Sequence, residues 1–133
     1  MKKKFSRSWK GSRQKRKQRK YRANAPKNIM KKFLSANLSK ELRKKHGKRS
    51  FPLRKGDEVK IMRGEFKGKK GQIESFNMKK LKVIIEGIQK TKKDGTKVNV
   101  IFSPSNLQIQ NLNLDDKKRL NSIEKKTKVK EEK

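Results

Sequence analysis

The sequence contains no cysteine and only one histidine, which excludes two common kinds of site. Without thiols there is no disulfide framework and no cysteine nucleophile, and one imidazole is too few for the usual structural zinc sites. Acidic residues are also scarce, at 12 against 43 lysines and arginines. Stability must therefore come from a small packed core and from a binding partner.

Long apolar runs are missing as well. The longest, Val83–Ile85 and Val100–Phe102, fall far short of the ~18 residues that a membrane-spanning helix requires. The opening MKKKFSRSWKGSR is basic but is followed by no apolar stretch, unlike a secretory signal. We therefore expect a protein that stays inside the cell and has no membrane partner.

The positive charge is abundant and unevenly spread. The net charge is +31, with 29% hydrophobic and 41% charged residues, so at most one small domain fits. Residues 1–54 hold 22 of the 43 lysines and arginines and a single acid, Glu41, whereas hydrophobic residues concentrate between Val59 and Leu112. This pattern favours a polyanionic partner, and nucleic acid is the leading candidate.

Composition divides the chain into four parts. We expect residues 1–23 to form a basic RNA-binding extension, 24–54 to contain short helices and an anchor, 55–114 to form a small barrel, and 115–133 to form a C-terminal helix and tail. The predicted fold class is mainly β.

Two short helices are expected before the barrel. Asn24 is placed to cap an amphipathic helix from Pro26 to about Leu34. A second helix runs from Ser39 to His46 and ends at Gly47, since glycine readily adopts the left-handed conformation.

Two further segments flank the barrel. Phe51-Pro52-Leu53 is typical of an extended anchor that leads into the core. Asp115 and Asp116 favour the start of a C-terminal helix, with Leu120 and Ile123 as its apolar stripe.

Between these flanks, apolar residues recur at every second position. Five short strands are predicted, centred on Val59, Ile73, Val83, Val100 and Ile109, with turn residues between them. Strands of this length and spacing suggest a closed or nearly closed barrel.

The first 22 residues carry twelve lysines and arginines and no acid, interleaved with Phe5, Trp9 and Tyr21. A block of like charges is not expected to fold alone, so we predict disorder when free and order when bound. The aromatic rings are candidates to stack on bases or to dock the arm. A solvated tail with incidental aromatics is the alternative.

The loop from Arg63 to Gly71 combines glycines with lysine and arginine. Glycine allows positive φ and lets backbone amides approach a phosphate, while the cations supply charge. A nucleotide-binding phosphate loop is excluded, because Gly64 and Gly68 are too close and Lys70 stands where serine or threonine is required. The alternative is a plain tight turn with solvated lysines, and Gly71 is expected to be architectural.

Catalysis is not expected. The single histidine, His46, has no orienting carboxylate nearby in the sequence, so a phosphate contact or a plain helix end suits it better than a general base. No cofactor or metal is expected. The candidate RNA contacts are Arg7, Trp9, Lys10, Arg13, Lys15, Arg16, Lys17, Arg19, Lys20, Tyr21, Arg22, Lys44, Lys45, His46, Lys48, Arg49, Arg63, Lys67, Gly68, Lys69, Lys70, Lys92 and Lys93.

Several stretches of the sequence resemble a known motif and a known protein family. The stretch RKGDEVKIMRGEFKGKKGQIESFNMKKLKVIIEG resembles the KOW motif. Its flanks, RKYRANAP, MKKFLSANLSKELRKKHGKRSFPLRKGD and DGTKVNVIFSPSNLQIQNLNL, resemble the KOW-domain large-subunit ribosomal protein numbered twenty-four in bacteria and twenty-six in eukaryotes. The resemblance runs from about Arg19 to Leu114, and RKQRKYR and LSKELRKK are similar to the archaeal and eukaryotic form.

The resemblance implies an SH3-like KOW barrel on large-subunit ribosomal RNA, near the RNA's 5′ domain and the rim of the peptide exit tunnel. It further implies a cytoplasmic protein of the large ribosomal subunit, a role in subunit assembly and translation, and neighbouring ribosomal proteins and nascent-chain factors as partners. The positions that match the RNA-facing KOW loop are Arg63, Lys67, Gly68, Lys69 and Lys70.

Three other readings compete with this one. A transcription elongation factor also uses KOW modules, but residues 1–54 are too basic to supply the additional α/β domain. A DNA-compacting protein is compatible with the charge alone. A membrane-active cationic protein is disfavoured, because the arm has no sustained amphipathic stripe.

Overall fold

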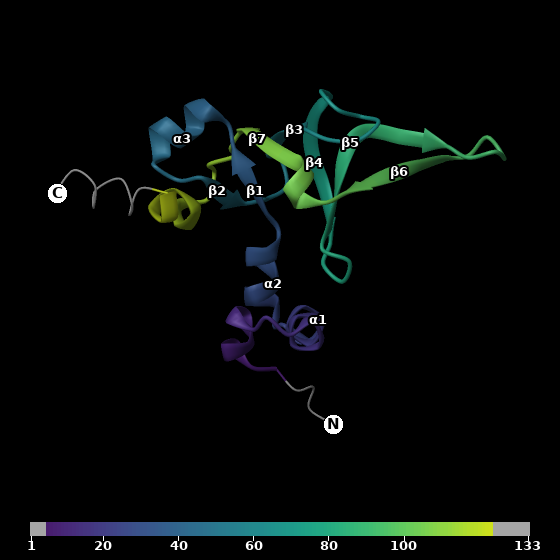
Figure 1. Ribbon diagram of the computed structural model, residues 1–133. Helices are drawn as coiled ribbons and strands as arrows, with labels where there is room; N and C mark the ends of the chain where they lie inside the picture. Colours follow the sequence, from purple (N-terminus) through teal and green to yellow (C-terminus); the bar gives the residue numbers. More distant parts are fainter. Residues whose placement is uncertain (1–4, 124–133) are drawn as a thin grey trace.

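The computed structural model describes residues 5–123, and its centre is an open sheet of seven strands (Figure 1). The strands lie in the order β2-β1-β7-β3-β4-β5-β6, and all neighbours are antiparallel except β1 and β7. Their bounds are β1 Ser35–Leu38, β2 Ser50–Pro52, β3 Glu58–Ile61, β4 Lys70–Asn77, β5 Lys82–Thr91, β6 Lys97–Phe102 and β7 Leu107–Asn111.

The five strands predicted from the period-two pattern are present as β3 to β7. Val59 and Ile61 of β3 are fully buried, and Val83 and Ile85 of β5 alternate in the same way. Farther along β5 its register with β6 shifts between Ile84 and Gln89, and Ile88 within this stretch is buried. These inward side chains form the centre of the hydrophobic core.

The expected closed barrel of five strands is not confirmed. β1 and β2 extend the sheet beyond β7, and within residues 5–123 the outer strands β2 and β6 do not pair with each other. β1 runs parallel to β7, with Asn37 opposite Gln108 and Leu38 opposite Ile109. The sequence Ser-Ala-Asn-Leu of β1 contains no β-branched or aromatic residue, so its pattern carries no strand signal.

The two short helices that were predicted between residues 26 and 46 are confirmed. The first, α2, spans Lys27–Phe33 and the second, α3, spans Lys40–His46. Ser39 caps α3 by accepting a hydrogen bond from the amide of Leu42, and Gly47 ends the helix in the left-handed conformation at φ 59°. The expected anchor at Phe51-Pro52-Leu53 is also extended, and most of it lies in β2.

The basic extension has regular structure, contrary to the expectation that its charge prevents it from folding. It forms the 3₁₀ helix η1, Arg7–Gly11, and the helix α1, Lys15–Asn24. Tyr21 of α1 stacks on Phe5 at 5.3 Å between ring centroids and meets Phe33 of α2 edge-on at 5.7 Å. The aromatic residues thus pack α1 against α2, which leads from β1 away from the sheet (Figure 1).

The predicted cap at Asn24 is wrong. Asn24 is the last residue of α1, and α2 follows Pro26 without a side-chain cap. The reason lies in Pro26, because proline disfavours helical backbone in the residue before it. Ala25 accordingly is extended, at φ −61° and ψ 136°, and separates the two helices.

The predicted C-terminal helix is confirmed as far as the described residues reach. Residues 117–123 are helical, and a carboxylate oxygen of Asp116 accepts a hydrogen bond from the amide of Lys118 at 2.8 Å. Ile123 belongs to the core at 3% exposure, while Leu120 is half-buried. The tail, residues 124–133, lies outside the described residues.

An ion pair that the sequence pattern did not predict holds this helix against the sheet. Arg119 donates from Nη1 to Asp57 Oδ1 at 2.6 Å and from Nη2 to Asp57 Oδ2 at 2.7 Å. The Asp57 carboxylate also accepts hydrogen bonds from the amides of Arg54 and Asn113. The Arg119 guanidinium also lies 5.3 Å from the ring centroid of Phe51, while its Nε is buried without a hydrogen-bond partner among the described residues.

Candidate nucleic-acid interface

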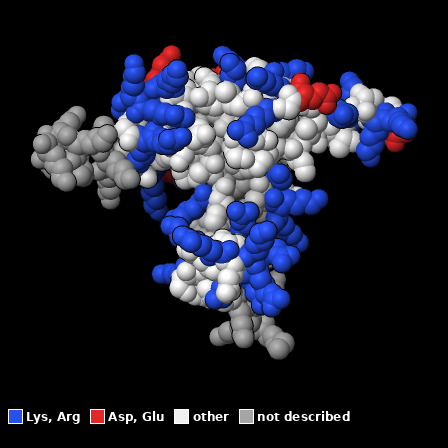
Figure 2. Space-filling model, in the orientation of Figure 1, with Lys and Arg blue, Asp and Glu red and all other residues white. Residues whose placement is uncertain are grey.

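Lysine and arginine side chains gather over the arm, which contains η1, α1 and the segment between them, around α3, and toward the tip of the hairpin formed by β5 and β6 (Figure 2). The middle of the face shown is mostly uncharged. The positive charge is therefore divided among several regions that the fold holds apart.

The arm carries the densest of these regions. Most of the predicted cations of η1, α1 and the segment between them are exposed, and no acidic residue occurs among residues 5–22 to neutralise them. Arg13, Lys15, Arg19 and Arg22 line a hollow of about 510 Å³ along α1. The exposed members of the predicted set are Arg7, Lys10, Arg13, Lys15, Arg16, Arg19, Lys20 and Arg22, and Lys17 is half-buried.

The aromatic residues of the arm serve packing more than display. Tyr21 is only 6% exposed, and its ring is occupied by Phe5 and Phe33, so its predicted role in stacking on a base is not supported. Trp9 is half-buried, and its carbonyl accepts a hydrogen bond from the side-chain amide of Gln18 at 2.8 Å. Aromatic residues interleaved with charge were consistent with stacking on bases or with packing of the arm. The contacts of Tyr21 show that its ring serves packing.

The basic loop between β3 and β4 is a series of tight turns. Gly64 and Gly68 have φ values of +90° and +91°, as the glycine pattern predicted. The amides of Lys67, Gly68 and Lys69 donate to the carbonyls of Gly64, Ile61 and Phe66, at 2.8 to 3.2 Å. These amides are already satisfied, so the predicted approach of backbone amides to a phosphate does not extend to them.

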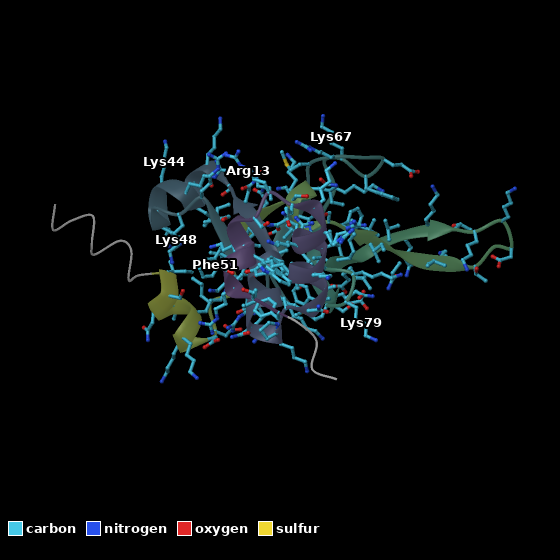
Figure 3. All side chains as sticks on the ribbon, turned by 60° about the horizontal axis from the view of Figure 1, so that its bottom comes forward. Arg13, Lys44, Lys48, Phe51, Lys67 and Lys79 are labelled. Carbon is cyan, nitrogen blue, oxygen red and sulfur yellow. The ribbon has the colours of Figure 1, made fainter. Side chains whose placement is uncertain are left out.

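The side chains of the same loop remain available. Arg63, Lys67, Lys69 and Lys70 are exposed, and Figure 3 shows Lys67 directed away from the protein. Lys69 Nζ lies 5.2 Å from the ring centroid of Phe66. The charge of this loop is thus presented by long side chains on a fixed set of turns.

Gly71 at the end of this loop is architectural, as predicted. A Cβ at this position would lie 2.7 Å from Cγ2 of Ile85 and 3.1 Å from the carbonyl oxygen of Glu86. A side chain here would push β4 away from β5, which it pairs with.

The end of α3 forms a second cationic corner. Lys44, Lys45 and Arg49 are exposed, and Figure 3 shows Lys44 directed outward. Partial burial, and then the charges of Lys45 and Lys48, lower the pKa of His46 below its ordinary value of 6.5. His46 is therefore neutral at physiological pH and adds no positive charge to this corner.

Lys48 has a structural role that its place in a basic run did not indicate. Its ammonium group donates to the carbonyl of Ser122 and lies 5.1 Å from the ring centroid of Phe51. Figure 3 shows it beside the C-terminal helix. This lysine helps to hold residues 117–123 in place.

The remaining predicted cations, Lys92 and Lys93, lie at the tip of the β5–β6 hairpin, far from the arm (Figure 1). The turn is formed by Asp94 and Thr96, whose amide and hydroxyl both donate to Asp94 Oδ1. These hydrogen bonds lower the pKa of Asp94. The structure does not bring this pair of lysines together with the other candidates.

Two functional candidates were missed by sequence reasoning. Lys80 and Lys82, in and after the turn between β4 and β5, line a cleft of about 480 Å³ together with Lys10 and Arg22 of the arm. Leu81 between the two lysines has φ 52°, which is uncommon for a residue with a side chain. The lysines themselves were visible in the sequence, but the packing that brings the arm beside them was not.

Residues 5–123 contain no group of three histidine, cysteine, aspartate or glutamate side chains that could hold a metal ion. Within the same range, no helix has the length and apolarity needed to span a bilayer.

Fold and surface together define a class: a small, strongly cationic sheet protein whose helical basic arm projects from the sheet. The model of the ribosomal protein family that comprises the eukaryotic L26 proteins and their archaeal counterparts, numbered twenty-four, matches residues 12–126. The chain belongs to this family of ribosomal proteins.

Three curated archaeal relatives, each named large ribosomal subunit protein uL24, support the assignment. The protein of Methanoculleus marisnigri is 48% identical over 108 residues, covering 81% of this chain and 89% of the relative. The protein of Korarchaeum cryptofilum is 44% identical, covering 83% and 84%, and that of Methanosarcina barkeri is 43% identical, covering 86% and 98%. The predictions of a cytoplasmic, non-enzymatic ribosomal protein of the archaeal type are thereby confirmed.

Proposed function

We propose that this protein binds large-subunit ribosomal RNA, supports assembly of the large ribosomal subunit and lies near the rim of the peptide exit tunnel. Membership of the ribosomal family and the names of the relatives support the setting. The KOW resemblance supports the finer location, with neighbouring ribosomal proteins and nascent-chain factors as further partners. β7 returns to pair with β3 beside the consecutive strands β4 to β6, which is compatible with the SH3-like barrel of that resemblance.

The observation that carries RNA binding is the cationic surface of α1. Residues 5–22 carry eight exposed lysines and arginines, with no acid among them. The like charges on such a surface repel one another in the free protein and are neutralised when the surface lies against a polyanion. Each cation that meets a phosphate releases condensed counterions, which provides the affinity.

Recognition is expected to depend on RNA shape. The deep, narrow major groove of helical RNA hides the base edges, so side chains read phosphates, 2′-hydroxyls and unpaired nucleotides instead. The sheet places the loop from Arg63 to Lys70 and the corner at Lys44 and Lys45 at fixed positions, while the arm reaches a separate part of the RNA. Specificity then arises from the arrangement of these contacts on a folded RNA.

A competition experiment tests this proposal. A folded fragment of large-subunit ribosomal RNA and duplex DNA of equal length are compared at matched ionic strength, and the protein is also sedimented with large subunits at moderate salt. We expect a clear preference for the RNA fragment and recovery with the subunits. Equal affinity for both polyanions, together with absence from the subunit fraction, would contradict the proposal and favour a general DNA-compacting role.

A further inference from the structure

An apolar pocket of about 530 Å³ lies where α2, the segment after β2 and the turn between β4 and β5 meet. Figure 1 shows α2 and this turn on the same side of the sheet. The volume falls within the range of about 300–1,000 Å³ that is typical of small-ligand sites. None of the candidate residues predicted from the sequence lines this pocket.

The floor of the pocket is fixed by the fold. Leu34 and Leu53 are 3% and 6% exposed, and the amide of Leu53 donates to the carbonyl of Leu34 at 2.9 Å. Phe76 and Met78 are half-buried and pack against the hydrophobic core. An aromatic ring, a thioether and two leucines therefore form the apolar part of the pocket lining.

The rim of the pocket has the opposite character. Lys31, Arg54 and Lys55 line it, all three are exposed, and no acidic residue is among the lining residues. Arg54 also pairs with Asp116, which lies outside the pocket and restrains the guanidinium near the rim. Apolar floor and cationic rim come from three separate segments of the chain.

We propose that this pocket binds one unpaired RNA nucleotide, with the base on Phe76 and Met78 and its phosphate at Lys31 and Lys55. A nucleotide joins a flat base that stacks on aromatic side chains to an anionic phosphate, which matches the floor and the rim together. A purely apolar peptide would match the floor but leave the lysines without a counter-charge. The inference rests on the proposed RNA binding and adds a position where a base, not only the backbone, is read.

The probes for the test are three RNAs. The first is a short single-stranded RNA with a fluorescent 2-aminopurine at its centre, and the second is the same RNA with an abasic site there. The third carries 4-thiouridine at that position for photocrosslinking to the full-length protein. The comparison of base with abasic site separates recognition of the base from attraction of phosphate by a basic surface.

The test variant is Phe76→Leu, which keeps an apolar side chain in the core, and the matched control is Phe102→Leu, because Phe102 is also part of the core but does not line the pocket. Thermal unfolding of both variants verifies that they are folded. We expect crosslinks at Phe76 or Met78, weaker binding of the abasic RNA, and about tenfold weaker binding of the 2-aminopurine RNA by Phe76→Leu alone. Equal affinity for the abasic RNA, crosslinks confined to other segments, or an equal loss in Phe102→Leu would overturn the proposal.

A parallel measurement separates this inference from the proposed function. The folded ribosomal RNA fragment is titrated with wild-type protein and with Phe76→Leu. If the wild type binds this fragment while the short RNAs show no dependence on the base, the pocket inference fails and the proposed function stands. If the wild type does not bind the fragment selectively, the proposed function fails.

Discussion

Asp57, immediately before β3, and Arg119, in the C-terminal helix, form a bidentate ion pair that is almost completely removed from solvent. Their side chains are 0% and 2% exposed, and the two N–O distances are 2.6 and 2.7 Å. Arg119 additionally donates to the carbonyls of Asn113 and Pro52. The pair therefore connects the end of the described chain with the beginning of the central strands.

Replacing Arg119 with methionine should lower the free energy of unfolding by about 3–5 kcal/mol, because Asp57 would be left as a buried charge without its cation. Urea denaturation measures the change. Arg54→Met is the matched control, since its pair with Asp116 lies at the surface and should contribute much less. A double variant, Asp57→Asn with Arg119→Met, should recover part of the loss, and equal effects of the two single arginine variants would contradict this role.

Gly71→Ala should destabilise the sheet by about 1–3 kcal/mol, because its Cβ would meet Ile85 at 2.7 Å. Gly11→Ala provides the control, since a Cβ there would have no neighbour within 4 Å. Thermal unfolding of the two variants gives the comparison. If Gly71→Ala were as stable as Gly11→Ala, the close packing of β4 on β5 would be wrong.

The lowered pKa of His46 predicts a pH dependence of stability. Burial and the charges of Lys45 and Lys48 disfavour the protonated ring in the folded state, so the unfolded state binds the proton more readily. Stability should therefore decrease as the pH falls through the ordinary value of 6.5 and below it. Urea midpoints of wild type and His46→Gln, measured on both sides of this value, should diverge in the acidic range, and parallel curves would show that His46 makes no contribution.

The loop between β3 and β4 should act through its side chains. Replacing Arg63, Lys67, Lys69 and Lys70 together by alanine should impair binding to the ribosomal RNA fragment and reduce the magnitude of the log-log salt slope by up to about 3, if all four meet phosphates. The strands should remain folded, because these side chains are exposed. Circular dichroism verifies the fold, and undiminished incorporation into large subunits would count against this loop as a docking surface.

The parts of the fold that sequence reasoning predicted are those with local signals. The alternation around Val59 and Val83, the helix start at Ser39 and the glycine at position 47 each reflect constraints within a few residues. β1 was not predicted, because its stability depends on β7, some seventy positions away in the sequence. A pairing of this kind leaves no mark on a short segment of small and polar residues.

The candidate interface likewise combines features that have a local sequence signal with features that depend on tertiary contacts. Charge density predicted the exposed cations of α1, since such residues are seldom buried. It could not distinguish Tyr21, which packs between Phe5 and Phe33, from a ring available to RNA. Lys48, Lys80 and Lys82 depend on segments that only the tertiary structure brings beside them.

The proposed RNA binding depends most directly on the arm, residues 1–22, as the element that binds phosphate. The decisive measurement is the salt dependence of binding to the folded ribosomal RNA fragment, for the full chain and for a chain without residues 1–22. With about 10 phosphate contacts, the full chain should give a log-log slope of about −7 to −9, and removal of the arm should flatten it markedly while the strands stay folded. An unchanged slope after removal would contradict the account.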